Sequence, residues 1–272
     1  MSAGRPTPKV TILLPVYNGE RFITSAIRSV LDQTFADFEL LIVDDCSTDA
    51  TSTCLKRLSD PRIVVVANSE NLGIQRSLNV GLHRARGRYI ARIDDDDIWI
   101  DNDKLAKQIA FLEMNPQYGL IGAGAVVVNE SGKELFRFLN PCDDRAIRKM
   151  LLGRNCFVHS SVVFPKDEAL KRGGYPESPA RRHVEDYDLW LAIGCDRALA
   201  NLPEHSVQYR LRASSISSTN RITQYKNNLR VVWRHASAYP NRTASLLRSF
   251  LRLILYGYLN LGVLRAITAR TK

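Results

Sequence analysis

Lys9-Val-Thr-Ile-Leu-Leu-Pro-Val16 is short, rich in β-branched residues and almost continuously apolar. A strand with one face in water alternates apolar and polar residues, whereas a strand that is buried on both faces does not. The stretch therefore predicts a central strand of a sheet that is covered on both sides. Tyr17-Asn-Gly-Glu20 follows with the composition of a turn. From Phe22 to Leu31, apolar residues then recur at helical spacing.

Strand and helix patterns continue to alternate after this first unit. Further strand-like runs span Glu39–Val43, Ile63–Val66, Tyr89–Ile93, Leu120–Val128 and His159–Phe164, and helical patterns lie between them, one of them near Lys104–Met114. This alternation predicts an α/β fold with a mostly parallel sheet and helices on both faces. Ligands of such sheets bind at the carboxyl ends of the strands. Here those ends carry Tyr17, Asp44-Asp45 and Asp94–Asp97, so we expect these side chains along one edge.

Asp94–Asp97 is a run of four aspartates directly behind a strand-like run. Adjacent carboxylates repel one another, and a hard cation such as Mg²⁺ would relieve that repulsion, with phosphate and water oxygens completing its shell. Because side chains alternate along a strand, Asp94 and Asp96 are expected on one side and Asp95 on the other. The alternative is a solvated acidic turn that precedes a helix.

Length and cysteine content place the chain in a broad class. Its 272 residues allow one large domain, or one domain with an appendage, and a core that needs no disulfide. The five cysteines include no CxxC pair, which argues against a disulfide framework and against a zinc site. Reduced thiols, and the lack of an apolar leader-like run in residues 1–9, predict a cytoplasmic protein.

The positive charge of the chain is confined to its last quarter. The formal net charge is +10, yet from His205 to Lys272 there are 12 Lys and Arg and no Asp or Glu. This asymmetry predicts an anionic partner for that end: a membrane surface, a nucleic acid or a phosphorylated ligand. No nucleic-acid-binding motif accompanies the charge, so nucleic acid is not the expected partner.

Two helical patterns, Ile222–Ala238 and Ala244–Ala269, follow a stretch rich in Ser, Thr and Asn at residues 214–224, which is either a mobile loop or a boundary. The uncharged run Leu253–Leu264 is 12 residues long, whereas a spanning helix needs about 20. A helix at a membrane interface fits better, as does a helix packed on the rest of the chain or on a second copy. We expect residues 214–272 to form a basic helical extension.

A series of motifs resembles glycosyltransferase family 2, whose members are inverting enzymes of the GT-A fold. The N-terminal motifs are Thr11-Ile-Leu-Leu-Pro-Val-Tyr-Asn-Gly19, Ser29-Val-Leu-Asp-Gln-Thr-Phe35 and Val43-Asp-Asp-Cys-Ser-Thr-Asp49. Ala91-Arg-Ile-Asp-Asp-Asp-Asp-Ile98 looks like the family's DxD block. His159-Ser-Ser-Val-Val and Glu185-Asp-Tyr-Asp-Leu-Trp190 resemble its acceptor-side motifs. One motif would be weak, but the whole series, in the expected order from about Val10 to Arg212, is specific.

The resemblance implies a GT-A, Rossmann-like catalytic domain over residues 1–213. Its nucleotide-sugar half would lie near residues 9–100 and its acceptor half near residues 101–213. Such a domain moves a sugar from a nucleoside-diphosphate sugar to a hydroxyl of a glycan or a lipid-linked acceptor in cell-surface polysaccharide synthesis. The implied cofactor is a divalent ion, Mn²⁺ or Mg²⁺. A lipid-linked acceptor would also suit a peripheral position on the inner face of the cytoplasmic membrane, reached through the basic extension.

On the donor side, the departing diphosphate builds up negative charge, which a divalent cation stabilises as a Lewis acid. The resemblance makes Asp96 the direct metal ligand and assigns Asp94 and Asp95 to the nucleotide sugar, with Asp94 supporting either the ribose or the metal. Asp97 matches an acid that binds indirectly. Asp95 stands where the family usually has a small residue, so the order of the ligands is open.

The nucleotide base falls by family position to Asp45, with Tyr17 stacking or packing near it and Pro15 shaping the wall. A carboxylate can accept the N3–H of uracil or of thymine. A UDP-sugar is therefore the default donor, and dTDP-rhamnose is the alternative. Core packing with a satisfied hydroxyl is an equal alternative for Tyr17, and a turn or cap role is the alternative for Asp44.

On the acceptor side, a hydroxyl is too weak a nucleophile to attack without a general base. The family's base is the Asp of its ED motif, which is Asp186 here. Glu185 and Asp188 are the rival carboxylates, although Asp188 would point elsewhere on a helix because positions i and i+2 do not share a face. A preference of helix N-termini for acids is the alternative for all three. In-line attack would invert the anomeric centre.

Supporting roles are open for several residues. His159 is either a packed side chain or a site residue. Arg76 and Arg92 can contact phosphate or pair with the aspartate run. Many family members carry Tyr-Arg-x-His where this chain has Tyr209-Arg-Leu-Arg212. Arg212 thus replaces the usual His, and its guanidinium can meet the diphosphate.

Two other function classes compete with a glycosyltransferase. A nucleotidyltransferase would also place acidic metal ligands on an α/β sheet, but it predicts a Gly-rich, Lys-containing phosphate loop that Pro15-Val-Tyr-Asn-Gly19 lacks. A catalytically inactive relative that only binds nucleotide or glycan would be expected to lack the acidic residues, yet Asp94, Asp96 and Asp186 are all present. The sugar, the acceptor and the oligomeric state are not indicated by the sequence.

Overall fold

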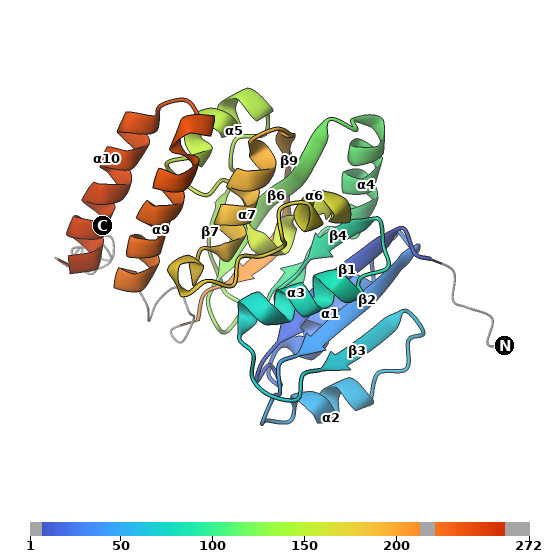
Figure 1. Cartoon of the computed structure of the whole chain (residues 1–272). Coiled ribbons are helices and arrows are strands. Elements are labelled where there is room, and N and C mark those ends of the chain that lie inside the picture. The colour runs from blue at the N-terminus through green and yellow to red at the C-terminus, as the bar shows by residue number, and fades with distance from the viewer. Residues whose placement is uncertain (1–6, 213–220, 259–272) are drawn as a thin grey trace.

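A computed structural model describes residues 7–212 and 221–258, which form one central sheet covered by helices (Figure 1). Its strands are β1 (Val10–Val16), β2 (Phe38–Asp44), β3 (Ile63–Ala67), β4 (Tyr89–Arg92), β5 (Ile98–Trp99), β6 (Tyr118–Val128), β7 (Glu134–Phe138), β8 (Val163–Pro165) and β9 (Ala198–Arg210). Their order is β3-β2-β1-β4-β8-β6-β9-β5, and β7 pairs with β6.

The helices that cover the sheet come from all parts of the chain. The α-helices are α1 (Ile23–Leu31), α2 (Thr51–Lys56), α3 (Ile74–Arg84), α4 (Lys104–Met114), α5 (Asp144–Leu151), α6 (Lys166–Leu170), α7 (Glu185–Gly194), α9 (Arg221–His235) and α10 (Arg242–Arg252). Short turns of other helix types are η1 (His159–Ser161), η2 (Pro179–Arg181), η3 (Ala236–Ala238) and η4 (Leu253–Tyr258).

The N-terminal half of the sheet is parallel, as predicted. β1 pairs in parallel with both β2 and β4, and β2 pairs in parallel with β3. Antiparallel β8 then connects β4 to the second half, where β6 and β9 run parallel. The α/β prediction with a mostly parallel sheet is thus confirmed, with antiparallel strands added at β5, β7 and β8.

Alternate residues of β1 face two different cores, which explains its continuous apolar run. Leu13 packs in one core with Leu78 of α3, whereas Ile12 and Leu14 pack in the other core, with α1. A side chain at Gly81 would collide with Leu13, so α3 lies close against the strand. Helices on both faces leave the carboxyl ends of the strands as the open edge.

The second half of the sheet contains the features that differ from the prediction. The expected strand from His159 to Phe164 is wrong at its start, because His159–Ser161 forms the turn η1 and only Val163–Pro165 pairs as β8. Four elements were not predicted, namely β5, β7, β9 and α5. Of these, β9 matters most, because it extends alongside β6 and ends at Arg210, close to the aspartate run.

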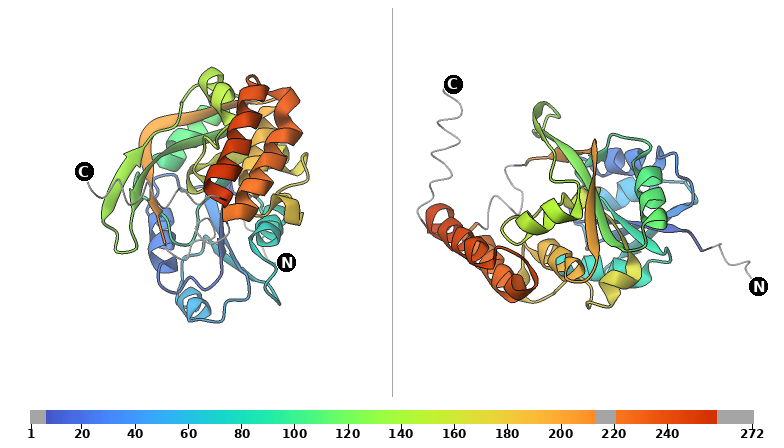
Figure 2. Two further views of the ribbon diagram at one scale, coloured as in Figure 1. Left: turned by 90° about the vertical axis from the view of Figure 1, so that its left-hand side faces the viewer. Right: turned by 90° about the horizontal axis from the view of Figure 1, so that it is seen from above.

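Helices α9 and α10 form an outer layer on one side of the domain (Figure 2). α9 packs against α7 and η2, and α10 packs against α9. The prediction of a helix at Ile222–Ala238 is confirmed, and Ala244–Ala269 is helical up to Tyr258, while residues 259–269 lie outside the described ranges. Within those ranges, none of the helices combines the length and the apolar character that crossing a bilayer requires.

Candidate active site

The four aspartates form a turn rather than the end of a strand. β4 ends at Arg92, and the backbone N–H of Asp97 donates to the carbonyl oxygen of Asp94 over 3.3 Å. The expected alternation along a strand is therefore wrong here. Instead, Asp94 and Asp97 converge on one hydroxyl, because a carboxylate oxygen of each lies within hydrogen-bond distance of Ser160 Oγ. Ser160 Oγ also accepts the backbone N–H of Asp94 over 3.0 Å.

Two guanidinium groups flank this turn. Arg92 is fully buried and donates to Asp94 Oδ1 over 2.6 Å, to His159 Nε2 over 3.0 Å and to the carbonyl oxygen of Leu13. Of the two alternatives for Arg92, pairing with the aspartate run is the one observed. On the other side, Arg212 Nε lies 2.7 Å from Asp96 Oδ2.

The turn holds more negative charge than these cations balance. Although burial opposes it, Arg92 keeps the pKa of Asp94 below its usual value. Burial raises the pKa of Asp96 despite the nearby Arg212, and burial with Asp96 and Asp94 raises the pKa of Asp97 well above normal. Burial and Asp96 raise the pKa of Asp95 to about 7. These shifts indicate a site in which an added cation would be stabilised.

Asp95 shows this surplus of acid most directly. Its buried Oδ2 has no hydrogen-bond partner within the described part of the chain. A Cβ placed on Gly19 would lie 2.5 Å from that oxygen, so the turn after β1 needs glycine there to make room for the carboxylate. An unpaired carboxylate oxygen in a buried place is costly unless a ligand or ion satisfies it.

A divalent ion fits this turn only together with a ligand. Among residues 7–212 and 221–258, no three His, Cys, Asp or Glu side chains are placed to hold an ion by themselves. A hard cation such as Mg²⁺ typically takes one or two carboxylates and completes its shell with phosphate oxygens and water. The acids of the turn match that incomplete donor set, with Asp96 paired to Arg212 and Asp95 with an oxygen that has no hydrogen-bond partner among the described residues.

The expected base-binding residues lie at the ends of β1 and β2. Asp45 is buried, and its carboxylate accepts from Asn68 Nδ2 over 2.8 Å and from the backbone N–H of Leu72 and Gly73 over 2.9 and 2.8 Å. Oδ2 receives only one of these donors, so it keeps a lone pair. These contacts bind the β3–α3 loop to the end of β2.

Near Asp45, Tyr17 is exposed to solvent, whereas Pro15 and Asp44 have structural roles. Tyr17 is 49% exposed, so core packing is wrong for it and its ring is available to a ligand. Pro15 lies inside β1, paired with Val43 of β2, so it can only form the floor of such a site. Asp44 accepts the backbone N–H of Ser47 over 3.0 Å, which is the turn role that was the alternative for this residue.

Asp186 lies at the N-terminus of α7, on the other side of the aspartate turn from the base-binding residues. Its Oδ1 accepts the backbone N–H of Tyr187 over 2.7 Å and its Oδ2 accepts from Asn155 Nδ2 over 3.2 Å. Burial raises its pKa to about 6, and the charge of Asp94 adds to the shift. A carboxylate with this pKa is ionised near neutral pH and still a competent proton acceptor.

The two rival carboxylates of the ED motif have different surroundings. Asp188 is buried against α9, where His235 Nε2 lies 2.6 Å from Oδ1 and Arg181 Nε donates to Oδ2 over 2.7 Å. It faces away from the aspartate turn, as the helical spacing predicted. Glu185 is buried with an unpartnered Oε2 within the described residues, and burial together with Asp186 raises its pKa to about 7.

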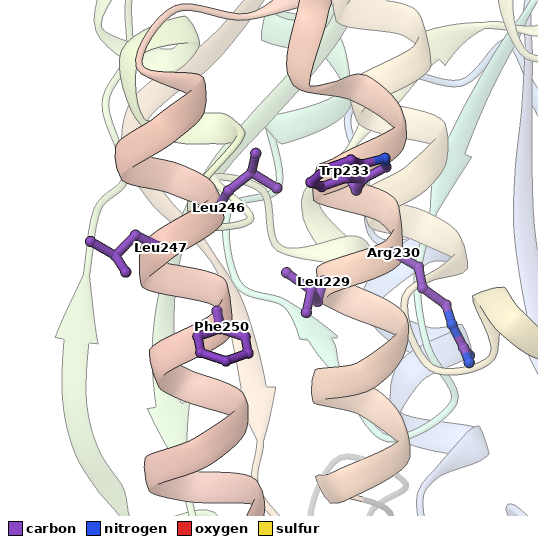
Figure 3. Close-up of a pocket in the computed structure, with 6 residues that line it drawn as sticks. All are labelled: Leu229, Arg230, Trp233, Leu246, Leu247 and Phe250. Carbon is purple, nitrogen blue, oxygen red and sulfur yellow. The ribbon is translucent and has the colours of Figure 1, made fainter.

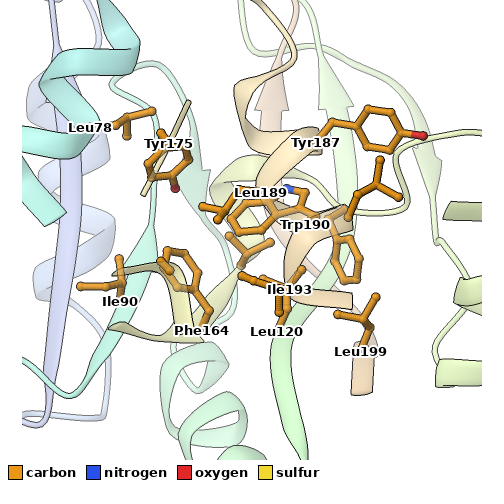
Figure 4. Packing of buried hydrophobic residues seen from close by; sticks show 14 of the residues in the cluster. Leu78, Ile90, Leu120, Phe164, Tyr175, Tyr187, Leu189, Trp190, Ile193 and Leu199 are labelled. Carbon is orange, nitrogen blue, oxygen red and sulfur yellow. The ribbon is translucent and has the colours of Figure 1, made fainter. Parts of the chain in front are cut away.

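An aromatic cluster packs against α7 in the core of the domain (Figure 4). Trp190 of α7 packs against Tyr175 and Phe164, and His159 lies within 6.0 Å of the Trp190 ring centre. His159 Nε2 is 3.2 Å from the Tyr175 hydroxyl and accepts from Arg92. Burial and the guanidinium of Arg92 lower its pKa to about 3. His159 is therefore a neutral positioning residue in this structure.

Tyr209 and Ser160 are site residues to which the motifs had assigned no role. Tyr209, near the end of β9, feels the charges of Asp97, Asp94, Asp96 and Asp186, which together with burial raise its pKa. Tyr209 is thus close to the aspartate turn and to Asp186. The stretches Tyr209–Arg212 and His159–Val163 did contain the signal, but tertiary pairing brings them to the turn: β9 pairs with β6, and β8 pairs with β4.

Arg76 is the one predicted support residue that lies elsewhere. Its Nε is 3.4 Å from Glu177 Oε2, and both side chains are largely exposed. Pairing of Arg76 with the aspartate run is therefore wrong, and its contact with phosphate stays a prediction.

Comparison with known proteins agrees with this arrangement. The model of "Glycosyl transferase family 2" matches residues 11–171. The chain is 36% identical over 211 residues to the Escherichia coli UDP-Glc:alpha-D-GlcNAc-diphosphoundecaprenol beta-1,3-glucosyltransferase WfgD, covering 77% of this chain and 79% of that protein. It is 33% identical over 230 residues to the Bacillus subtilis putative glycosyltransferase EpsE, covering 80% and 81%.

Solved structures share the fold at lower identity. Staphylococcus aureus TarS 1-349 in complex with UDP-GlcNAc superposes with a TM-score of 0.70 at 19% identity, over 92% of this chain and 73% of that chain. The mannosyltransferase PcManGT from Pyrobaculum calidifontis, in complex with GDP-Man and Mn²⁺, gives 0.64 at 18% identity, over 97% and 80%. With the family match over residues 11–171, the chain belongs to glycosyltransferase family 2 and has its GT-A fold.

Proposed function

We propose that the chain transfers a sugar from a nucleoside-diphosphate sugar to a hydroxyl of a glycan or lipid-linked acceptor, with inversion at the anomeric carbon and with Asp186 as the general base. The observation that carries the proposal is the position of Asp186, which lies within electrostatic range of Asp94 and has its pKa raised to about 6. The leaving diphosphate at the aspartate turn and the attacking hydroxyl at Asp186 would thus both lie close to Tyr209.

The donor would lie along the strand ends from β2 to β4. Asp45 Oδ2 has a lone pair for the N3–H of a pyrimidine, and Tyr17 offers an exposed ring. Relatives and neighbours support a uridine nucleotide, because WfgD is named for UDP-Glc and TarS is bound to UDP-GlcNAc. A dTDP-sugar is the alternative, since a carboxylate reads uracil and thymine alike.

The diphosphate would lie against the aspartate turn. A divalent ion held by Asp96, with Asp95 or Asp94 in support, would supply Lewis-acid stabilisation of the leaving diphosphate. The surplus of carboxylate in the turn supports this assignment, as does the Mn²⁺ bound to the neighbour PcManGT. Arg212 would contribute a guanidinium at the same edge.

On the acceptor side, Asp186 would accept the proton of the attacking hydroxyl while Asn155 and the Tyr187 N–H hold its carboxylate in place. The acceptor we favour is a saccharide on a lipid diphosphate, because WfgD is named for such an acceptor. Synthesis of a cell-surface polysaccharide at the inner face of the cytoplasmic membrane follows from that acceptor class.

The test is transfer and donor binding by Asp186→Asn. Without the base, transfer should fall by at least about 100-fold, while the affinity for the sugar nucleotide, measured by calorimetry with Mn²⁺, stays within a few-fold of the parent protein. Transfer by the parent protein should rise as the pH increases through about 6, where Asp186 loses its proton.

Three results would contradict the proposal. Transfer at the parent rate by Asp186→Asn would exclude Asp186 as the base. Donor binding without turnover by the parent protein, given lipid-linked acceptors, would instead favour a nucleotide-binding relative that has lost catalysis. A product with retained anomeric configuration would exclude the in-line mechanism.

A further inference from the structure

Helices α9 and α10 leave an apolar groove on the surface of the domain. Its lining residues come from both helices and are drawn in Figure 3: Leu229, Arg230, Trp233, Leu246, Leu247 and Phe250. The groove has a volume of about 560 Å³. It lies on the outer layer of the domain that these two helices form (Figure 2).

Its apolar side chains are unusually exposed for their size. Trp233 is 72% exposed, Leu247 59% and Phe250 49%. Both helices nevertheless have a buried side, on which Val231 and Val232 of α9 enter the core cluster of α7. The helices are therefore already docked, and the groove is a second apolar surface that points outward. Contiguous exposed apolar surface of this kind marks an interaction site.

The charge of the two helices identifies the kind of partner. α9 and α10 together contain seven Lys and Arg and no Asp or Glu. Arg230 lines the groove itself, and Arg242 is exposed on the second helix, whereas Arg234 lies 3.7 Å from Asp188 on the α7 side of α9. An apolar groove on two helices that carry only positive charge matches an interface in which acyl chains lie beneath anionic headgroups.

We propose that the α9–α10 groove docks the protein on an anionic phospholipid bilayer, with Trp233, Leu247 and Phe250 inserted at the level of the headgroups. Tryptophan is favoured at that depth because it combines an apolar ring with one N–H donor. The inference rests on the proposed function in one respect: a lipid-linked acceptor gives the enzyme a reason to work at a bilayer. The surface itself is argued from exposure and charge alone.

The chain offers a direct optical probe of this docking. It contains three tryptophans, of which Trp99 and Trp190 are buried and Trp233 is exposed. The emission of the full-length protein, titrated with vesicles of phosphatidylcholine containing phosphatidylglycerol, should shift to the blue. Lipids brominated near the headgroup should quench that emission. Pure phosphatidylcholine vesicles should bind at least about tenfold more weakly, and added salt should weaken the anionic case.

Matched variants distinguish binding through the groove from nonspecific binding of the protein to vesicles. Trp233→Phe should lose the spectral shift but still sediment with anionic vesicles, because its side chain stays apolar. Trp233→Ser combined with Phe250→Ser should reduce sedimentation by at least about tenfold. Met114→Ser is the control, since Met114 is 75% exposed on α4, remote from the groove, and should change nothing.

Other occupants of the groove predict other results. If a second copy covers it, Trp233 emission shifts with protein concentration in the absence of vesicles, and the double Ser variant becomes monomeric. If another part of the chain covers it, the emission of Trp233 is already that of a buried indole and vesicles do not change it. Either result, or binding to neutral and anionic vesicles alike, overturns the proposal.

Failure of this inference can be told apart from failure of the proposed function. The double Ser variant should transfer sugar to a short, water-soluble acceptor as fast as the parent protein, because none of the residues that line the groove belongs to the candidate active site. Vesicle binding without any transfer by the parent protein would contradict the proposed function only. Transfer without vesicle binding would contradict the docking surface only.

Discussion

Arg212 Nε lies 2.7 Å from Asp96 Oδ2, so the carboxylate with the strongest claim to a metal ion already faces a guanidinium. The pair is an ion pair by distance, since Arg212 Nε has no aligned hydrogen-bond acceptor within the described residues. A divalent ion on Asp96 would therefore compete with Arg212. Release of Arg212 would leave its guanidinium at the edge where the diphosphate is expected, which is the contact that Arg favours.

Removing this guanidinium should strengthen metal binding. In Arg212→Met, the affinity for Mn²⁺ without nucleotide should rise by roughly three- to tenfold, because a positive charge near the ion is lost. Arg212→His should gain at least as much, since imidazole is itself a metal ligand. Titration of free Mn²⁺ followed by electron paramagnetic resonance measures the effect without any turnover.

Asp96→Asn is the control for this experiment. It should weaken Mn²⁺ binding in the parent background and abolish the gain from Arg212→Met. Unchanged Mn²⁺ affinity in Asp96→Asn would show that Asp96 is not a ligand. Unchanged affinity in Arg212→Met, with Asp96→Asn defective, would show that the ion pair does not oppose the metal.

Ser160 offers a test of how the aspartate turn is held. Its hydroxyl contacts the carboxylates of Asp94 and Asp97, whereas the adjacent Ser161 hydroxyl donates to the carbonyl oxygen of Val158. Both serines are fully buried in the same turn. Ser160→Ala should lower stability by about 1–3 kcal/mol and weaken binding of the sugar nucleotide with Mn²⁺ by at least about fivefold.

Ser161→Ala is the matched control for Ser160→Ala. It should cost a similar amount in urea unfolding and leave donor affinity within about twofold, because Ser161 contacts no carboxylate. Equal donor affinities in the two variants, measured by calorimetry, would show that the Ser160 hydroxyl does not organise the turn.

The raised pKa of Asp186 carries a cost in stability at neutral pH. With a native pKa of about 6, above the ordinary aspartate value of 3.8, the native protein binds this proton more tightly than the unfolded chain does. The group therefore favours folding at low pH, and that contribution is lost as the pH rises towards 6. Asp186→Asn should accordingly stabilise the protein on the order of 1–3 kcal/mol at pH 8, while it abolishes transfer.

Urea unfolding at two pH values checks this prediction. The gain in Asp186→Asn should be about 1 kcal/mol smaller at pH 5 than at pH 8, because part of the native carboxylate is then protonated. Glu70→Gln is the control, since Glu70 is exposed on the β3–α3 loop. A gain that does not change with pH would mean that Asp186 titrates normally in the folded protein.

The sequence was sufficient to predict a strand or helix where the spacing of apolar residues within that segment determines which of its faces is buried. The strand at Val10–Val16 and the helix at Lys104–Met114 follow from apolar spacing alone, and the structure has both. β9 was missed because Pro203-Glu-His205 interrupts its apolar pattern. What maintains that strand is its long pairing with β6, which depends on residues about 80 positions earlier.

In the candidate site, too, the sequence predicted some features, and others depend on tertiary structure. Family motifs assigned roles to Asp45, Asp96 and Asp186; the first two follow β2 and β4 of the sheet, whereas Asp186 comes near Asp94 through α7. The turn at Asp94–Asp97 could not be predicted, since strand alternation holds only while the ladder continues, and β4 ends at Arg92. Likewise, the place of Tyr209 among four carboxylates depends on tertiary pairing.

The last prediction concerns the contact that fastens α9 to α7. His235 Nε2 lies 2.6 Å from Asp188 Oδ1, and Arg181 donates to the other oxygen of the same carboxylate. Although burial opposes both shifts, their mutual contact raises the pKa of His235 and, with Arg181, lowers that of Asp188. Breaking a buried pair leaves one charge without its partner, which is strongly destabilising.

His235→Gln should therefore lower stability by about 2–4 kcal/mol at pH 6, measured by urea unfolding. Because the native pKa of His235 is raised, its contribution is complete below about 6.5 and is lost as the pH rises through that raised value, so the variant should cost less at pH 9. A double-mutant cycle with Asp188→Asn isolates the pair. Equal costs at pH 6 and pH 9 would show that the interaction does not require a charged imidazole, and additive costs in the cycle would show that the two residues act independently.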